Sequence, residues 1–240
     1  MRENNDQTAP SKARKRFPGA ITLRVLSALL GYPDALLRSH LPEMSDLLRH
    51  ERVLSAARAA ELQALMANLL AADPLAAEAA YVELFDRGRA TSLHLFEHVH
   101  GDSRDRGPAM IDLGQTYAKV DLFLAEGELP DYLPAVLEFV STQPPAEAKA
   151  FLGEISHLLK GIFGALHQRE SLYASVLGAL LELAGEQAEA VQPAPEPPID
   201  ESWAEPVVFD GCSTQGQARP GQPQPVRIVR KADYSKGASL

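Results

Sequence analysis

The chain has 240 residues, of which 45% are hydrophobic and 23% charged, and its formal net charge is −9. This size and composition are typical of one globular domain with tails. The single cysteine, Cys212, excludes an intramolecular disulfide and a paired-cysteine metal site. No stretch reaches the roughly 18 apolar residues of a membrane helix. The polar N-terminus lacks the apolar core of a secretion signal, so we expect a cytoplasmic protein.

The net charge is spread unevenly along the chain. Residues 1–20 carry +3, residues 191–240 carry −1, and the segment between them carries −11. An acidic surface argues against nucleic acid as the partner, because phosphate binding needs a positive field. It favours a basic partner such as a cationic peptide, although acidity that only aids solubility explains it equally well. The basic run KARKR at 12–16 could bind an anionic surface.

Helical periodicity begins after a polar lead-in, residues 1–18, which we expect to be disordered. Apolar residues recur at helical spacing from Ile21 to Leu30, and Gly31 and Pro33 end this helix. Further on, Asp73 is a predicted N-cap with Pro74 at the first helical position. The first four predicted helices cover about residues 21–30, 33–50, 53–70 and 74–86, the second one broken or bent near Pro42.

The helical pattern continues in the second half of the chain. A short helix is predicted over 92–99, capped by Thr91 or Ser92, and the next has Pro108 in its first turn and runs to about Ala125. Asp131 is the predicted N-cap of the helix that follows, with Pro134 early in that helix. After Pro144-Pro145, amphipathic segments cover about 146–167 and 170–190.

Together these elements predict an all-α, single-domain bundle of about eight helices over residues 19–190. No β alternation appears in this region. Residues 191–240 form a Pro/Gly/Gln-rich tail that we expect to be mostly disordered. Within the tail, Trp203–Phe209 could dock on the bundle or on a partner.

The stretch 81–113 concentrates charges of both signs, and three of the seven histidines, between apolar helices. Such a dense cluster is more often a functional site than a solvated surface. Within it, His94, Glu97 and His98 match H-x-x-E-H, an inverted zinc-protease motif. Histidines four apart share one helical face and can hold zinc, while the glutamate could activate water. The alternative is that His94 lies on a partly exposed helix face, since no later segment supplies an obvious third ligand.

The following residues, Asp102, Arg104, Asp105 and Arg106, alternate in sign. One interpretation is a local lattice of ion pairs, each worth only about 0–1 kcal/mol when exposed. The other is the wall of a polar groove, in which carboxylates receive the arginine or lysine side chains of a partner. The residue pattern alone leaves both open.

Longer runs of sequence carry a family resemblance. The segments YVELFDRGRATSL at 81–93 and LFEHVHGDSRDRG at 95–107 closely resemble the signature of the nitrate reductase molybdenum-cofactor assembly chaperones, also called nitrate reductase delta subunits. Supporting matches are LGYP at 30–33, DPL at 73–75, ELPDYLP at 128–134 and QRESLY at 168–173. In the tail, Trp203-Ala204-Glu205 also fits, although Pro206 departs from the pattern. In this family the position of His94 is commonly apolar, so the resemblance implies that H-x-x-E-H is incidental.

The resemblance implies an all-helical, non-catalytic chaperone of the cytoplasm that needs no cofactor or metal of its own. Its expected partner is the apo form of the catalytic subunit of a membrane-bound respiratory nitrate reductase, including the basic N-terminal peptide of that subunit. The chaperone would keep this subunit competent for molybdenum-cofactor insertion and iron–sulfur maturation. A zinc-dependent hydrolase that uses the motif at 94–98 is the alternative function.

Within this framework we assign client-binding roles to side chains of the central stretch. The aromatic ones would form an apolar wall, the carboxylates would pair with client cations, and the arginines would hold those carboxylates in place. The histidines could titrate near neutral pH and modulate affinity. The predicted client-binding residues are Tyr81, Phe85, Glu97, His98, His100, Asp102, Arg104, Asp105 and Arg106.

Overall fold

A computed structural model describes residues 18–101 and 103–189, which fold into an all-α bundle, as predicted. The lead-in, Asp102 and the tail with its Trp203–Phe209 segment lie outside the described residues. None of the helices in the described part is long and apolar enough to cross a membrane. Over these residues there are ten α-helices and one 3-10 helix: α1 (Ala20–Leu29), α2 (Ala35–Glu51), α3 (Ala56–Ala71), α4 (Pro74–Phe85), η1 (Arg89–Thr91), α5 (Leu95–Val99), α6 (Arg106–Ala118), α7 (Leu133–Thr142), α8 (Pro145–Glu154), α9 (Ser156–Gln168) and α10 (Ala174–Ala184).

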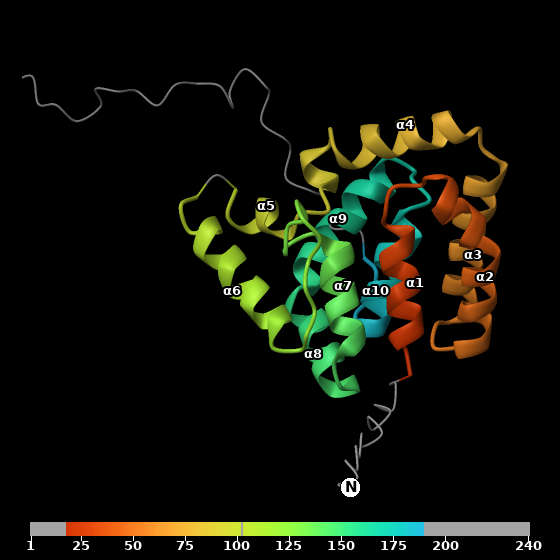
Figure 1. Cartoon of the computed structure of the whole chain (residues 1–240). Coiled ribbons are helices and arrows are strands. Elements are labelled where there is room, and N and C mark those ends of the chain that lie inside the picture. The colour runs from red at the N-terminus through yellow and green to blue at the C-terminus, as the bar shows by residue number, and fades with distance from the viewer. Residues whose placement is uncertain (1–17, 102, 190–240) are drawn as a thin grey trace, which may run out of the picture. The chain divides into compact units, whose positions relative to one another are not determined.

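Helix α10 is the centre of the bundle (Figure 1). It packs against α1, α3, α8 and α9, and α1 in turn packs along α2 and α7. Val176, Leu177 and Leu180 of α10 are completely buried. A helix that is apolar on most of its surface must be enclosed on most sides, which explains this central position.

Helices α4, α5 and α6 lie outside this centre. In Figure 1, α4 crosses the top of the bundle and α6 stands to one side of it. All thirteen residues of α6 are described, and Tyr117 alone among them is buried. Its ring packs on Phe139 of α7, and its hydroxyl donates to the carbonyl of Pro130 at 2.7 Å. Helix α6 therefore buries one side chain, near its C-terminal end, while Leu113 packs against the core only partly buried.

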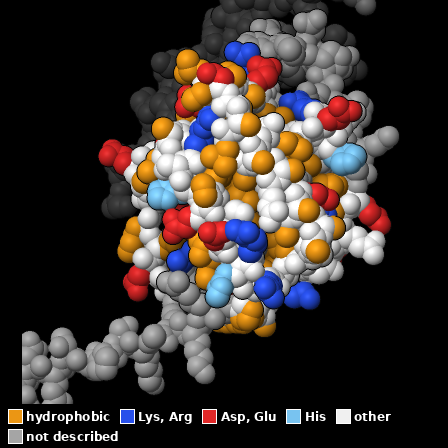
Figure 2. Space-filling view, turned by 90° about the vertical axis from the view of Figure 1, so that its right-hand side faces the viewer, with side chains coloured by type: hydrophobic (Ala, Val, Ile, Leu, Met, Phe, Trp, Pro, Cys, Tyr) orange, Lys and Arg blue, Asp and Glu red, His pale blue; other side chains and the backbone are white. Residues whose placement is uncertain are grey.

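The outer surface on the α2–α3 side is mixed in character. Figure 2 shows hydrophobic side chains there between basic and acidic ones. Leu36 of α2 and Leu70 of α3 are both exposed. The acidic excess of the chain is therefore not concentrated on this face.

Side-chain caps fix the start of the first four helices. Asp34, Ser55 and Asp73 each accept a hydrogen bond from the backbone N–H three residues further on, as N-caps do. The first helix is capped from a distance. The carboxylate of Glu51, at the end of α2, accepts hydrogen bonds from the N–H groups of Gly19 at 2.9 Å and Thr22 at 2.6 Å. The N-cap role predicted for Asp73 is confirmed.

Several predicted helix ends are wrong, and left-handed residues explain two of them. Helix α6 ends at Ala118 rather than near Ala125, because Asp121 adopts a φ of 59° and the N–H of Leu122 bonds back to the carbonyl of Tyr117. The last helix starts at Ala174, not Glu170, since Glu170 has a φ of 52° and closes α9 in the same way.

Two further boundaries differ from the prediction. The segment predicted as continuous over 146–167 is divided at Ile155 into α8 and α9. Helix α10 ends at Ala184 and not near residue 190, because Gly185 follows it in the left-handed conformation with a φ of 83°. Leu172 lies before α10 and is 43% exposed.

The distant cap of α1 gives a stability prediction. Replacing Glu51→Ala leaves the N–H groups of Gly19 and Thr22 without their acceptor, so we expect a loss of about 1–3 kcal/mol in the free energy of unfolding, measured by urea denaturation. Glu43→Ala on the same helix is the control, because within the described residues the exposed Glu43 side chain pairs with His40 on its own helix and caps no helix start. An equal loss in both variants would contradict the capping role.

Candidate functional site

The central charged stretch is organised around Asp131, a carboxylate that is fully buried. One of its oxygens accepts a hydrogen bond from the N–H of Phe96 at 3.1 Å, and the other lies 3.3 Å from Nδ1 of His94. The guanidinium of Arg106 lies 3.9 Å away. A buried carboxylate needs such partners, because leaving it unpaired is costly.

The role predicted for Asp131 is therefore wrong. It does not cap its own helix: α7 begins after Tyr132, which makes no side-chain capping bond. Asp131 instead caps α5, which is 35 residues earlier in the chain. The predicted helix over 92–99 is correspondingly shorter and starts at Leu95, with His94 outside it in an extended conformation.

Backbone hydrogen bonds join the same two segments. The N–H of Leu95 donates to the carbonyl of Asp131 at 3.0 Å, and the N–H of Leu133 donates to that of Leu93 at 2.8 Å. His94 and Tyr132 thus face each other in an isolated antiparallel bridge, with ring centres 5.3 Å apart. This bridge holds the start of α5 against the start of α7.

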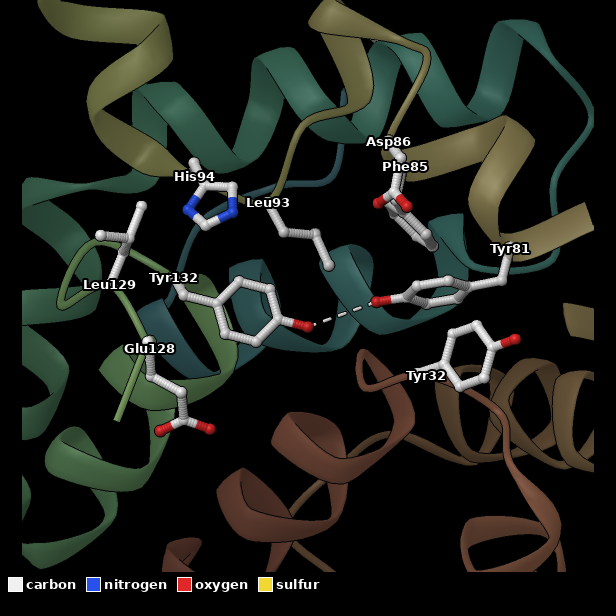
Figure 3. Close-up of a pocket in the computed structure, with 10 residues that line it drawn as sticks. Tyr32, Tyr81, Phe85, Asp86, Leu93, His94, Glu128, Leu129 and Tyr132 are labelled. Carbon is white, nitrogen blue, oxygen red and sulfur yellow. Dashed lines mark hydrogen bonds between the residues drawn. The ribbon is translucent and has the colours of Figure 1, made fainter. Parts of the chain in front are cut away.

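A pocket of about 430 Å³ opens beside this bridge (Figure 3). The tyrosines Tyr81 and Tyr132 point toward each other across it, with their hydroxyl oxygens 3.3 Å apart. Asp86 and Glu128 place exposed carboxylates among its lining residues. The lining comprises Tyr32, Tyr81, Phe85, Asp86, Leu93, His94, Gly127, Glu128, Leu129 and Tyr132.

An aromatic cluster positions the Tyr81 side of the pocket. The ring of Tyr81 contacts those of Tyr32, Phe85 and Tyr173, with centres 4.8–6.0 Å apart. Its hydroxyl donates to the carbonyl of Leu30 at 2.6 Å. Burial raises the pKa of Tyr81 far above its usual value near 10, and burial also raises the pKa of Tyr132. Both side chains remain neutral phenols at physiological pH and offer hydrogen-bonding groups on an apolar wall.

Four of the predicted client-binding residues lie at this pocket or beside Asp131. Tyr81 and Phe85 are each only 5% exposed, and they line the pocket. Glu97 and Arg106 face each other at 3.7 Å, next to Asp131. The predicted pairing of Arg106 with a carboxylate is present in this arrangement.

The remaining predicted residues lie elsewhere. The ring of His98 contacts the carbonyl of Ser92 at 2.9 Å, and that of His100 packs edge-on against Phe96. Arg104 and Asp105 are exposed in the turn before α6. None of these four side chains is among the described residues that line the pocket, and Asp102 lies outside the described residues.

Sequence reasoning missed other residues of this region. Tyr32, Glu128, Asp131 and Tyr132 lie in the segments LGYP and ELPDYLP, which supported the family resemblance but received no client-binding role. A signal for Asp131 was available, because an acid between apolar residues at a predicted helix start needs a partner. The sequence gives no means of identifying that partner as α5.

The geometry does not support a zinc site at the H-x-x-E-H motif. His94 precedes α5 and pairs with Asp131, Glu97 faces Arg106, and His98 contacts a backbone carbonyl. The three side chains are thus directed to three different partners. Across the described part of the chain, no group of three or more histidine, cysteine or acidic residues could hold a metal ion.

The helical fold is shared with a solved structure. The structure titled "Crystal Structure Of A Putative Redox Enzyme Maturation Protein From Archaeoglobus Fulgidus" matches with a TM-score of 0.51, covering 70% of this chain and 94% of that one at 19% identity. This likeness concerns the fold alone.

Sequence comparison then gives the family. A family model for the nitrate reductase delta subunit matches residues 51–187, and the chain belongs to this family. It is 48% identical over 164 residues to the nitrate reductase molybdenum cofactor assembly chaperone NarJ of Escherichia coli K12, covering 68% of this chain and 70% of the relative. "Probable nitrate reductase molybdenum cofactor assembly chaperone NarW" from the same organism is 45% identical, covering 68% of each chain.

The pairing of His94 with Asp131 predicts a pH-dependent stability. The hydrogen bond to Asp131 raises the pKa of His94, against the opposing effect of burial. The stabilisation is therefore fully present below the unfolded-state pKa of about 6.5 and is lost as the pH rises through the folded-state pKa. We expect His94→Gln to lower the urea midpoint more at about pH 6 than at about pH 9. His157→Gln on α9 is the matched control, and the same loss at both pH values for His94→Gln would contradict the pairing.

Proposed function

We propose that this chain is a dedicated chaperone that binds the apo catalytic subunit of a membrane-bound respiratory nitrate reductase and assists insertion of its molybdenum cofactor. The chaperone acts in the cytoplasm, holds the subunit open for cofactor loading, and performs no catalysis itself. It binds the basic N-terminal segment of the subunit as part of this interaction. The observation that carries the proposal is the 48% identity to a molybdenum cofactor assembly chaperone over 68% of the chain.

The pocket beside Asp131 supports a peptide client. Its floor is aromatic, with Tyr81, Phe85 and Tyr132, and its lining includes the exposed carboxylates of Asp86 and Glu128. An apolar side chain can be buried on this floor, while a lysine or arginine can lie over an aromatic face near the acids. This combination suits a segment that is both basic and partly apolar.

The charged turn before α6 adds a second point of contact in this proposal. Asp105 is exposed there, and Glu97 is about one-third exposed beside Arg106. Client cations that reach these carboxylates would gain directional, charge-assisted hydrogen bonds. Because the sites are solvent-accessible, each contact is worth little by itself and is weakened by salt.

The proposed function is tested with the complete protein and its cognate catalytic subunit. We expect the immobilised chain to capture the cofactor-free subunit and to release it when the molybdenum cofactor is loaded. A subunit that lacks its N-terminal segment should be captured less well. Nitrate reductase purified from cells that lack the chaperone should contain less molybdenum, measured by elemental analysis, than enzyme from cells that have it. Supplying the chain to the deficient cells should restore the molybdenum content. Equal capture of empty and loaded subunit would refute the proposal.

A charge-removing variant tests the carboxylate contacts separately. We expect Glu97→Gln combined with Asp105→Asn to weaken binding of the client's N-terminal peptide by about 3- to 30-fold, because two exposed charge pairs are worth about 0.3–1 kcal/mol each. The remaining affinity should depend less on salt, as measured by calorimetry at two ionic strengths.

Glu147→Gln combined with Glu154→Gln is the matched control, since it removes two charges from α8, away from the pocket. The control should reproduce the wild-type affinity and most of its salt dependence. Unchanged affinity of the first variant at low salt would rule out a role for Glu97 and Asp105.

A further inference from the structure

A second groove of about 340 Å³ lies between α1 and α2, and it is separate from the pocket beside Asp131. Its apolar lining includes Val25, which is buried, and Ile21, Met44 and Leu47, which are half-buried and pack on the core. The exposed polar side chains that complete the lining are Arg24 on α1 and His40 and Glu43 on α2. An apolar groove with a charged rim is typical of a site that receives a short amphipathic segment.

The chain enters the described structure at one end of this groove. Gly19 is held by the carboxylate of Glu51, the last residue of α2, so the chain arrives between the two helices that form the groove. Ile21 lies two residues further on and already lines the groove. Pro18 and Gly19 form a turn, in which Gly19 has a φ of 105°. A left-handed residue at this position allows the chain to change direction, which is compatible with a preceding segment that runs back along α1.

The length and composition of the preceding segment fit the groove. From Ile21 to Ala28 the groove follows α1 for about 10 Å, at 1.5 Å per residue, a distance that three or four extended residues span at about 3.3 Å each. The residues immediately before the turn are Arg14, Lys15, Arg16 and Phe17. An aromatic ring such as that of Phe17 suits the apolar lining, and the exposed carboxylates of Glu43 and Asp46 on α2 suit the basic residues.

Attachment to the groove's end favours this segment over any free partner. A ligand tethered by one or two residues experiences an effective concentration on the order of millimolar or higher. One buried aromatic ring and a few exposed charge pairs are then enough to keep the groove filled, even though the same contacts would bind a free peptide weakly.

We propose that the N-terminal segment around Arg14–Phe17 docks in the groove between α1 and α2 of its own chain, with Phe17 on the apolar lining and the basic residues toward α2. This intramolecular docking assigns a role to the basic run KARKR, which the chaperone function leaves unused.

Photo-crosslinking in the full-length chain tests this docking. The photoreactive residue p-benzoylphenylalanine replaces Phe17, and crosslinked products are mapped by mass spectrometry. We expect most product to be intramolecular and to join position 17 to residues 40–47. Met44→Glu, which places a charge on the apolar lining, should lower this yield about tenfold. Lys15→Glu combined with Arg16→Glu should lower it about two- to fivefold at low salt.

Leu70→Glu is the matched control, because Leu70 is an exposed leucine on α3 outside the groove, and it should leave the crosslinking yield unchanged. Circular dichroism of each variant establishes that the bundle is folded. Crosslinks between two copies would mean that the segment of a second chain fills the groove. Crosslinks scattered over the surface, or no crosslinks to residues 40–47, would mean that this segment does not occupy the groove. Each of these results overturns the proposal. None of them bears on capture of the catalytic subunit, so this proposal and the chaperone function fail independently.

Discussion

The buried carboxylate of Asp131 is the interaction on which the arrangement of the candidate site depends. It joins three parts of the chain: the start of α5 through Phe96, the extended His94, and the start of α6 through Arg106. A carboxylate without solvent is stable only with such partners, so each contact constrains the others. Because Tyr132 follows Asp131 directly, the same network also places the tyrosine that forms one wall of the pocket.

The opposite wall is held by aromatic packing instead of charge. Tyr81 is fixed by three neighbouring rings and by the carbonyl of Leu30, which directly follows the first helix. Rings in edge-on contact are rigid and lose little conformational entropy when a ligand binds. The pocket therefore combines aromatic side chains that are held in place by packing with carboxylates that are exposed to solvent.

Local signals in the sequence were enough to predict the helical class and the starts of several helices. Asp73 with Pro74 is an example, because cap and helix are adjacent in the chain. Helix boundaries were harder to predict where Asp121 and Glu170, rather than glycine, adopt the left-handed conformation, because these residue types do not mark the end of a helix in the sequence. For the site, the family signature led to Tyr81, Phe85, Glu97 and Arg106, but the role of Asp131 depends on a partner 35 residues away. No periodicity or spacing rule encodes such a long-range contact.

Helix α6 is attached to the bundle in a way that links it to the pocket. Its two polar anchors, Arg106 near one end and Tyr117 near the other, reach the adjacent residues Asp131 and Pro130. The same segment continues into Tyr132. The segment 130–132 thus contacts α6 and also contributes Tyr132 to the pocket. The position of α6 and the shape of the pocket are therefore thermodynamically linked, and the linkage is reciprocal. An interaction that holds α6 in place therefore also stabilises the shape of the pocket, and any ligand that fixed the pocket would stabilise α6 by the same free energy.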